Sequence, residues 1–303
     1  MSIYEELHIE KIINASDTYT RIGGSRMSPR TLEAMEEAAG NFVDIGDLSD
    51  SICNAIAART GNETAFISSG TGACLILTAC ACMVLGDQDL ACRLPDASQC
   101  LKNEIIIFQS QKDCPSLPYW HLIELSGAKL IPVKDDLTAL EKAVNHRTAA
   151  VFFFAGTVYE WSTPRLSDVI AAAHNHEIPV IVDAAAQLPA KSMMSYYTAE
   201  LGADAVIFSG GNFINGPQTT GIVLGRRQIL DHCKALANPN VRIGRPYKVG
   251  KEEYAAFYRA CMDFLDSNEE KGYQELKRIL EEVGNSCPDR KAESVFNAKG
   301  ALL

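Results

Sequence analysis

Short apolar runs recur along the chain and alternate with segments whose apolar residues have helical spacing. The apolar runs lie at 64–69, 103–109, 129–133, 149–155, 178–184, 204–209 and 220–225, and amphipathic segments between them lie at 71–84, 117–127, 136–145 and 165–176. Strands that alternate with helices in this way are typical of a mostly parallel sheet with helices on both faces. The pattern therefore predicts an α/β fold with a seven-stranded, mainly parallel sheet.

Near residue 250 the pattern changes to charged helical sequence, "KEEYAAFYRACMDFLD" followed by "NEEKGYQELKRILEEV". This change predicts a long linking helix that leads into a second domain, and the weak periodicity after Asn285 indicates that this domain is short. We expect an N-terminal arm with helices at 1–60, a ligand-binding large domain at 61–245, and the linking helix with the small domain at 246–303.

The composition favours a large buried core and small-molecule partners. The 303 residues are 47% hydrophobic and 22% charged, and the net charge of −10 argues against chain-wide affinity for nucleic acid or an anionic membrane. The sequence has neither a secretory-type leader nor an apolar run of the roughly 18 residues that a membrane span needs. We expect a cytoplasmic protein with no membrane or nucleic-acid partner.

Ten cysteines are spread over this long chain, which favours reduced thiols over a disulfide framework. They are Cys53, Cys74, Cys80, Cys82, Cys92, Cys100, Cys114, Cys233, Cys261 and Cys287. Three of them lie in "GACLILTACACMVLG", which reads as a buried helix rather than a metal site. His174 and His176 read as solvent-exposed residues at the end of a helix.

Three stretches that follow predicted strands carry candidate chemistry, because ligands of such sheets bind at the carboxyl ends of strands. "SSGTGA" (68–73) opens a helix, where it could bind phosphate or only permit close packing. Asp183 ends the run "VIVD", where it could cap the next helix or pair with a protonated ring nitrogen, as in pyridoxal phosphate enzymes. Ser209 and Asn212 follow the next run, in "FSGGNFINGPQ". In this order and spacing the three stretches favour pyridoxal phosphate more strongly than any one of them does.

Seven ordered segments carry a resemblance to a known family; they are 12–28, 66–81, 92–109, 118–133, 178–189, 202–226 and 243–253. The chain resembles the fold-type I pyridoxal-phosphate (PLP) enzymes, in the branch of selenocysteine synthase, and is most similar to relatives of the D-glucosaminate-6-phosphate ammonia-lyase type. The resemblance implies the PLP-transferase fold type I and lyase or transferase chemistry on an amino acid or amino sugar acid. It also implies a homodimer or higher oligomer, with the glycine-containing arm 17–27 suited to reach a site at the subunit interface.

The resemblance also implies roles for individual residues. Asp183 resembles the aspartate that pairs with the pyridine nitrogen, and Ala185 resembles the small residue packed against the ring. Gly70, Thr71 and Gly72 resemble, together with Ser209, the cradle of the cofactor phosphate. Arg245 lies in "GRPYKVGKE", where the family binds acidic groups or secures the small domain, so either substrate binding or a structural salt bridge is implied.

Three departures from the family pattern stand beside these likenesses. The family reads Ser-Gly-Gly-Lys where this chain has Asn212, and an amide can neither form the Schiff base nor move a proton at the α-carbon. Residues 109–118 lack the histidine that stacks on the ring, and the small domain that follows the linking helix reads as truncated.

Two hypotheses follow from these departures. The first is an enzyme in which Asn212 is an engineered change or another amine, such as Lys112, Lys191 or Lys248, takes its place. The second is a non-catalytic homologue or partner subunit. Under either hypothesis, PLP bound to the sequence as written would be held without a covalent bond to residue 212.

Overall fold

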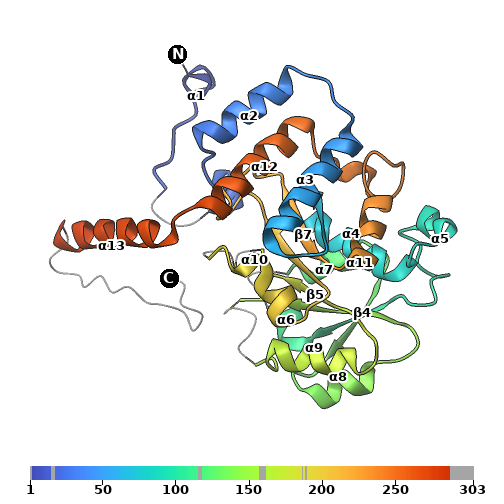
Figure 1. Cartoon of the computed structure of the whole chain (residues 1–303). Coiled ribbons are helices and arrows are strands. Elements are labelled where there is room, and N and C mark those ends of the chain that lie inside the picture. Colours follow the sequence, from blue (N-terminus) through green and yellow to red (C-terminus); the bar gives the residue numbers. More distant parts are fainter. Residues whose placement is uncertain are drawn as a thin grey trace.

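A single seven-stranded sheet forms the centre of the molecule (Figure 1), which is described from a computed structural model for residues 2–14, 18–114, 118–156, 162–185, 187 and 190–286. The strands are β1 (Thr64–Ser68), β2 (Glu104–Phe108), β3 (Lys129–Val133), β4 (Thr148–Phe154), β5 (Val180–Asp183), β6 (Ala205–Ser209) and β7 (Gly221–Gly225). Their order in the sheet is β1-β7-β6-β5-β4-β2-β3. β7 runs antiparallel to β1 and β6, and the other neighbouring strands are parallel. The prediction of a seven-stranded, mainly parallel sheet is confirmed, and each predicted run overlaps one strand.

Helices cover both faces of this sheet, and further helices lie near the two ends of the chain (Figure 1). In chain order, the helices of both groups are α1 (Ile3–Glu6), η1 (Thr20–Ile22), α2 (Pro29–Ala39), α3 (Ile45–Thr60), α4 (Gly70–Val84), α5 (Gln88–Arg93), α6 (Gln109–Lys112), α7 (Trp120–Glu124), α8 (Leu137–Ala143), α9 (Leu166–His174), α10 (Met193–Ser195), η2 (Tyr196–Glu200), α11 (Arg227–Leu236), η3 (Arg245–Tyr247), α12 (Lys251–Asp266) and α13 (Glu269–Ser286). The amphipathic segments predicted at 71–84, 136–145 and 165–176 correspond to α4, α8 and α9. The segment predicted at 117–127 contains the shorter helix α7.

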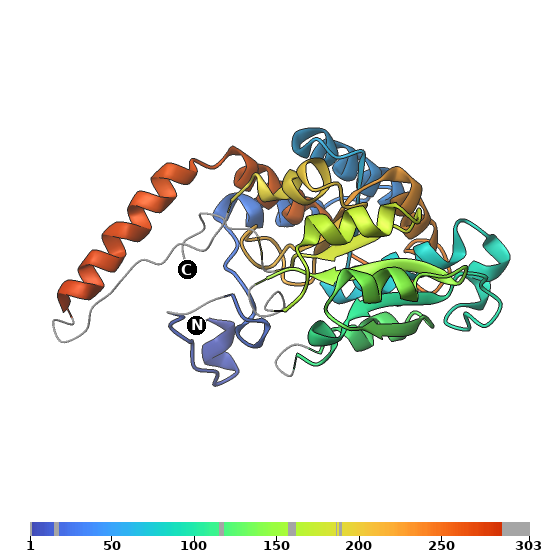
Figure 2. The same ribbon diagram turned by 90° about the horizontal axis from the view of Figure 1, so that it is seen from below.

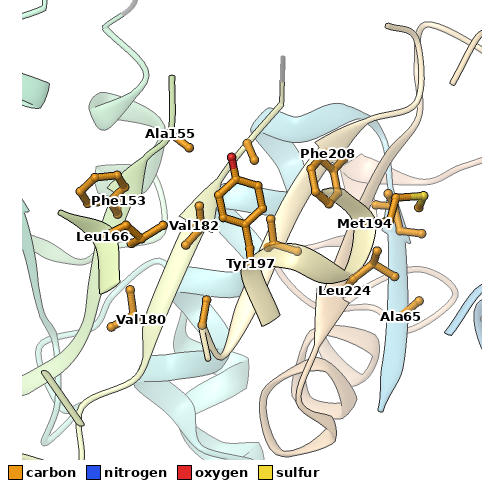
Figure 3. Close-up of a cluster of buried hydrophobic side chains, with 14 of the residues drawn as sticks. Ala65, Phe153, Ala155, Leu166, Val180, Val182, Met194, Tyr197, Phe208 and Leu224 are labelled. Atoms are coloured by element: carbon orange, nitrogen blue, oxygen red, sulfur yellow. The ribbon is translucent and has the colours of Figure 1, made fainter. Parts of the chain in front are cut away.

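The core has two parts because successive strand residues point to opposite faces of the sheet. On one face, strand side chains pack against α3, α9 and α12, and Figure 3 shows part of this cluster, with Phe153, Val182, Tyr197 and Phe208. On the other face, strand side chains such as Phe152 pack against α4 and α11. All residues of β4 are buried, which explains why a central strand reads as a continuous apolar run rather than an alternating one.

Helix α4 is buried on almost every side, since every residue from Ala73 to Val84 is buried. Cys74, Cys80 and Cys82 contribute to the core, which confirms the prediction for this segment. Burial raises the pKa of each of these thiols, so they stay protonated and behave as small apolar groups. Cys287 lies outside the described residues.

The two C-terminal helices differ, since α12 packs on the body of the molecule and α13 projects from it (Figure 2). α12 packs against α2 and α3 and buries Tyr254 and Phe257. Figure 2 shows α13 extending away from the body of the molecule, with the N-terminal arm beneath it. Within the described ranges, no helix is both long and apolar enough to cross a membrane. The division into arm, large domain and truncated small domain stays a prediction, and its last part, 287–303, lies outside the described residues.

Candidate cofactor-binding site

A cavity of about 280 Å³ opens at the carboxyl ends of the central parallel strands. Phe154 is the last residue of β4, Asp183 of β5 and Ser209 of β6, and the parallel strands bring these three ends to one edge of the sheet. The cavity is lined by Thr18, Tyr19, Thr20, Thr71, Gly72, Leu75, Tyr119, Phe154, Ala155, Asp183, Ala185, Ser209, Asn212 and Phe213.

The start of helix α4 forms one wall of the cavity. Gly70 has φ +80°, and a Cβ atom at the neighbouring Gly221 would lie 2.5 Å from the carbonyl carbon of Gly70. A glycine at 221 therefore lets β7 approach the turn between β1 and α4. The N-cap residue Ser69 makes no side-chain capping hydrogen bond, and Thr71 and Gly72 of the first turn line the cavity. An uncapped helix N-terminus of this kind favours an anion.

Asp183 is a buried carboxylate without a cationic partner. Its side chain accepts a hydrogen bond from the backbone N–H of Ala185 at 3.0 Å, and the residue is 7% exposed. Among the described residues, no lysine, arginine or histidine forms an ion pair with it. Burial raises the pKa of Asp183 from 3.8 to about 6, although the hydrogen bond from Ala185 acts in the opposite direction. A cation at this end of the cavity would remove the cost of the buried charge.

The carbonyl oxygen of Ala185 accepts hydrogen bonds from two further residues of the cavity lining, which together with Asp183 form the cavity floor. It accepts hydrogen bonds from the side-chain Nδ2 of Asn212 at 3.2 Å and from the backbone N–H of Ser209 at 3.4 Å. Asn212 is half-buried and lines the cavity. Its side chain is therefore held against the same loop that carries Ala185.

Tyr119 also lines the cavity, close enough to Asp183 for the two groups to interact electrostatically. Burial and the negative charge of Asp183 both raise the pKa of the Tyr119 phenol, so its hydroxyl stays protonated. Nothing in the sequence around Tyr119 marked it as a site residue. It follows the segment 109–118, in which the expected histidine is missing and of which 115–117 lie outside the described residues.

The N-terminal arm reaches the cavity of its own chain. Thr18, Tyr19 and Thr20 line it, and the backbone N–H of Ser25 donates to the carbonyl oxygen of Gly211 at 2.9 Å. This contact ties the arm to the loop that carries Asn212. The segment 17–27 was expected to reach a site, but its individual residues were not identified from the sequence.

The structure brings most of the predicted site residues together. Thr71, Gly72, Asp183, Ala185, Ser209 and Asn212 all line the cavity, and Gly70 adjoins it as the first residue of α4. Arg245 lies elsewhere: it belongs to η3, is exposed, and donates a hydrogen bond to the side-chain oxygen of Asn238. Its expected role in substrate binding stays a prediction.

The three lysines that could replace the missing amine also lie outside the cavity lining. The ammonium of Lys112 lies 4.9 Å from the centre of the Trp120 ring, and Lys191 donates to the carbonyl oxygens of Leu265 and Ser267. Lys248 is exposed. Among the described lining residues there is no lysine at all.

Residues 45–240 match the family model of the class-V aminotransferases. The chain belongs to this family. It is 28% identical over 287 residues to a D-glucosaminate-6-phosphate ammonia lyase of Salmonella typhimurium, covering 93% of this chain and 75% of the relative. A solved structure of a D-glucosaminate-6-phosphate ammonia-lyase superposes with a TM-score of 0.81 at 28% identity, covering 88% of this chain and 71% of the other.

A third relative is more distant. An L-seryl-tRNA(Sec) selenium transferase of Nitratidesulfovibrio vulgaris is 23% identical over 280 residues, and the match spans 86% of this chain and 56% of the relative. The resemblance to fold-type I PLP enzymes of this branch is confirmed, and so is the expectation of a PLP-dependent family.

The cavity fits most parts of pyridoxal phosphate. Asp183 fits a protonated pyridine nitrogen, because it is buried and has no cation among the described residues. The hydroxyl groups of Thr71 and Ser209 make no hydrogen bond within the described part of the chain and lie at the cavity, where they fit phosphate oxygens. Leu75 and Phe213 add apolar walls for the ring. Asn212 does not fit the covalent link, since an amide nitrogen is not nucleophilic.

Proposed function

We propose that this chain binds pyridoxal 5'-phosphate in the cavity without a covalent bond, next to a second ligand that is an amino acid or amino sugar acid. The observation that carries the proposal is the buried carboxylate of Asp183, which has no cationic partner among the described residues and lies in the same cavity as Asn212. A cationic ring would neutralise the buried carboxylate of Asp183. The amide of Asn212 cannot form the covalent bond to the cofactor that a lysine forms. Binding then depends on the polar groups of the floor and of the α4 N-terminus.

Each of these groups has a role that does not need residue 212. Bound pyridoxal phosphate supplies an electron sink for bonds at the α-carbon of an amine. Asp183 holds the proton at the ring nitrogen, and the first turn of α4 holds the phosphate with Thr71 and Ser209. The protonated hydroxyl of Tyr119 donates a hydrogen bond to the bound ligand. Asn212 moves no proton, because its amide is not a base at any physiological pH.

The amino sugar acid is supported by the relatives. The D-glucosaminate-6-phosphate ammonia lyase is similar over 93% of this chain. Ammonia elimination needs a base that removes the proton at the α-carbon, and we find no lysine or histidine among the described lining residues. This observation favours a second candidate function, a non-catalytic homologue or partner subunit that binds the same ligands.

Reduction with borohydride tests the non-covalent binding. The protein is mixed with pyridoxal phosphate in a buffer without primary amines, reduced, and weighed by intact mass spectrometry. We expect the mass of the bare polypeptide for the natural sequence and a cofactor adduct at position 212 for Asn212→Lys. Asn240→Lys, on an exposed loop, is the control for adducts with any added lysine. A stoichiometric adduct on the natural sequence would show that another lysine is used.

Ammonia release separates the two candidate functions. D-glucosaminate 6-phosphate is incubated with the cofactor-loaded protein and ammonia is measured over hours. The non-catalytic candidate predicts no release above the rate with free cofactor, and the lyase candidate predicts turnover. Because loss of the general base removes about 10²–10⁴-fold of rate before the loss of covalent catalysis is counted, a slow residual rate must be compared with Asn212→Lys.

We also propose that the chain assembles as a homodimer or higher oligomer. In support, Ile3, Leu7, Ile9, Ile12 and Ile13 of the arm are at least half exposed, and α1 buries no residue within its own chain. An apolar stripe of this kind is typical of a contact surface. Sedimentation velocity at micromolar concentration should give a species larger than 33.0 kDa, and a strictly monomeric protein would contradict the proposal.

A further inference from the structure

We infer that Asn212 makes the cavity selective for the amine form of the cofactor, pyridoxamine 5'-phosphate, over the aldehyde form. The inference rests on the proposed function, since it concerns the same cavity. It goes beyond it by naming the chemical form that the cavity takes up and the residue that selects it.

The hydrogen bond of Asn212 fixes which end of its amide is available. A peptide carbonyl oxygen can only accept, so the group 3.2 Å from the Ala185 oxygen must be the amide nitrogen. This bond uses one of the two N–H groups of the amide nitrogen. The amide oxygen accepts no hydrogen bond from the described residues. Residue 212 therefore offers a ligand a free acceptor, the amide oxygen, together with one remaining N–H.

The other groups of the cavity add negative charge and no positive charge. Asp183 is the one carboxylate among the described lining residues, and neither lysine, arginine nor histidine lines the cavity there. The raised pKa of the Tyr119 phenol keeps that hydroxyl neutral. Asp183 pairs with the protonated ring nitrogen that both cofactor forms share. The group that differs between the forms meets the amide oxygen of Asn212, with no cation beside it among the described lining residues.

The two forms of the cofactor differ at the group that the family's lysine would engage. Pyridoxal phosphate carries an aldehyde there, whose oxygen cannot bond to the amide oxygen of Asn212 and could accept only a neutral hydrogen bond from the remaining N–H. Pyridoxamine phosphate carries an ammonium, which donates hydrogen bonds and brings a positive charge. In a family member with lysine at this position, the aldehyde is favoured by the covalent bond it forms. Asparagine removes that advantage and favours the donor.

Equilibrium binding to the ligand-free protein tests the inference. The probes are pyridoxamine 5'-phosphate, pyridoxal 5'-phosphate and 4'-deoxypyridoxine 5'-phosphate, which has a methyl group in place of the amine, each titrated by calorimetry in a buffer without primary amines. A net hydrogen bond to a charged group corresponds to at least about tenfold in affinity, so we expect the amine to bind about tenfold more tightly than the aldehyde or the methyl compound.

Two substitutions assign the preference to residue 212. Asn212→Leu keeps the size of the side chain and removes the acceptor, so the preference should fall to about twofold or less. Asn212→Asp adds a negative charge, so the preference should rise above that of the natural sequence. Asn240→Leu removes an exposed amide elsewhere and should leave the preference unchanged. Circular dichroism confirms that each variant is folded.

The outcomes separate the inference from the proposed function. Equal affinity for amine and aldehyde, or an unchanged preference in both Asn212→Leu and Asn212→Asp, would overturn the inference and leave the cofactor site in place. Failure of all three compounds to bind at millimolar concentration would overturn the proposed function, and the inference with it.

Discussion

Two buried aspartates, Asp204 and Asp183, lie at opposite ends of neighbouring strands of the sheet. They differ in the cations and hydrogen-bond donors that surround their carboxylates. Asp204, at the amino end of β6, is 3% exposed, and Asp183, at the carboxyl end of β5, is 7% exposed. One oxygen of Asp204 accepts from His174 at 2.9 Å and from the backbone N–H of Val180 at 2.7 Å, and the other pairs with Arg226 at 2.8 Å. Within the described part of the chain, Asp183 accepts only the hydrogen bond from Ala185.

This difference distinguishes a carboxylate that stabilises the fold, Asp204, from one that is available to a ligand, Asp183. Burial of a carboxylate is costly unless cations and donors compensate it, and the chain supplies all of these to Asp204. Among the described residues it supplies Asp183 with one donor and no cation, and burial raises the pKa of this carboxyl. A carboxylate that the chain keeps buried and uncompensated in a cavity is a functional-site candidate, because a ligand cation can complete it.

The largest expected loss of stability is at Asp204, whose charge has ionic and hydrogen-bond partners. Asp204→Asn leaves one acceptor for three donors, so Arg226 and the backbone N–H of Val180 cannot both keep their bonds. We expect the free energy of unfolding to fall by about 1–3 kcal/mol, the usual cost of leaving a buried donor without its acceptor, because the charge of the half-exposed Arg226 can still be solvated. Urea unfolding at pH 7 measures it. A loss below about 1 kcal/mol would mean that the comparison between the two aspartates is false.

The same change at the other end should have the opposite sign. Asp183→Asn keeps an acceptor for the Ala185 N–H and removes a charge that has no partner in the described residues. Without ligand, we expect this variant to be more stable than the natural protein above pH 7, by about 3 kcal/mol at most, since its pKa shift of about two units corresponds to that amount. Its affinity for the pyridine cofactor should fall.

The gain in stability should depend on pH in a defined direction. The folded pKa of Asp183 is about 6 and its ordinary value is 3.8, so below pH 3.8 the group is protonated in both states and carries no penalty. As the pH rises through 6, the natural protein loses stability and the variant does not. Urea unfolding of both proteins at pH 4 and pH 8 checks this. A difference that is the same at both pH values would contradict an uncompensated carboxylate.

The sequence predicted the sheet well because its central strands are buried on both faces. β2, β4, β5 and β7 consist of buried residues and therefore appear as continuous apolar runs. The carboxyl ends of β5 and β6 located Asp183 and Ser209 at one edge of the sheet. The site residues that follow a strand could thus be predicted before any contact was known.

Residues that reach the site from elsewhere could not be predicted in this way. Tyr119 lies beside Asp183 only because α7 packs near the start of α4, and that contact leaves no local pattern. The interpretation of His174 as a solvent-exposed residue was wrong, because its ring pairs with Asp204 across thirty positions of the chain. Side-chain partners at such separations depend on the packing of whole elements rather than on spacing.

The smallest expected effect on stability and cofactor affinity is at Arg245, which contacts neither Asp204 nor Asp183 in the described structure. Its exposed guanidinium bonds to Asn238 and lies outside the cavity lining, so Arg245→Ala should change the free energy of unfolding by no more than about 0.5 kcal/mol. Cofactor affinity should stay within about twofold, whereas Asp183→Asn lowers it. The predicted role in substrate binding is tested separately, by titrating D-glucosaminate 6-phosphate into the cofactor-loaded protein: loss of affinity for this acid alone would support the role. Loss of cofactor affinity in Arg245→Ala would instead mean that η3 closes over the cavity, and the two charges that define the site would then be Asp183 and Arg245.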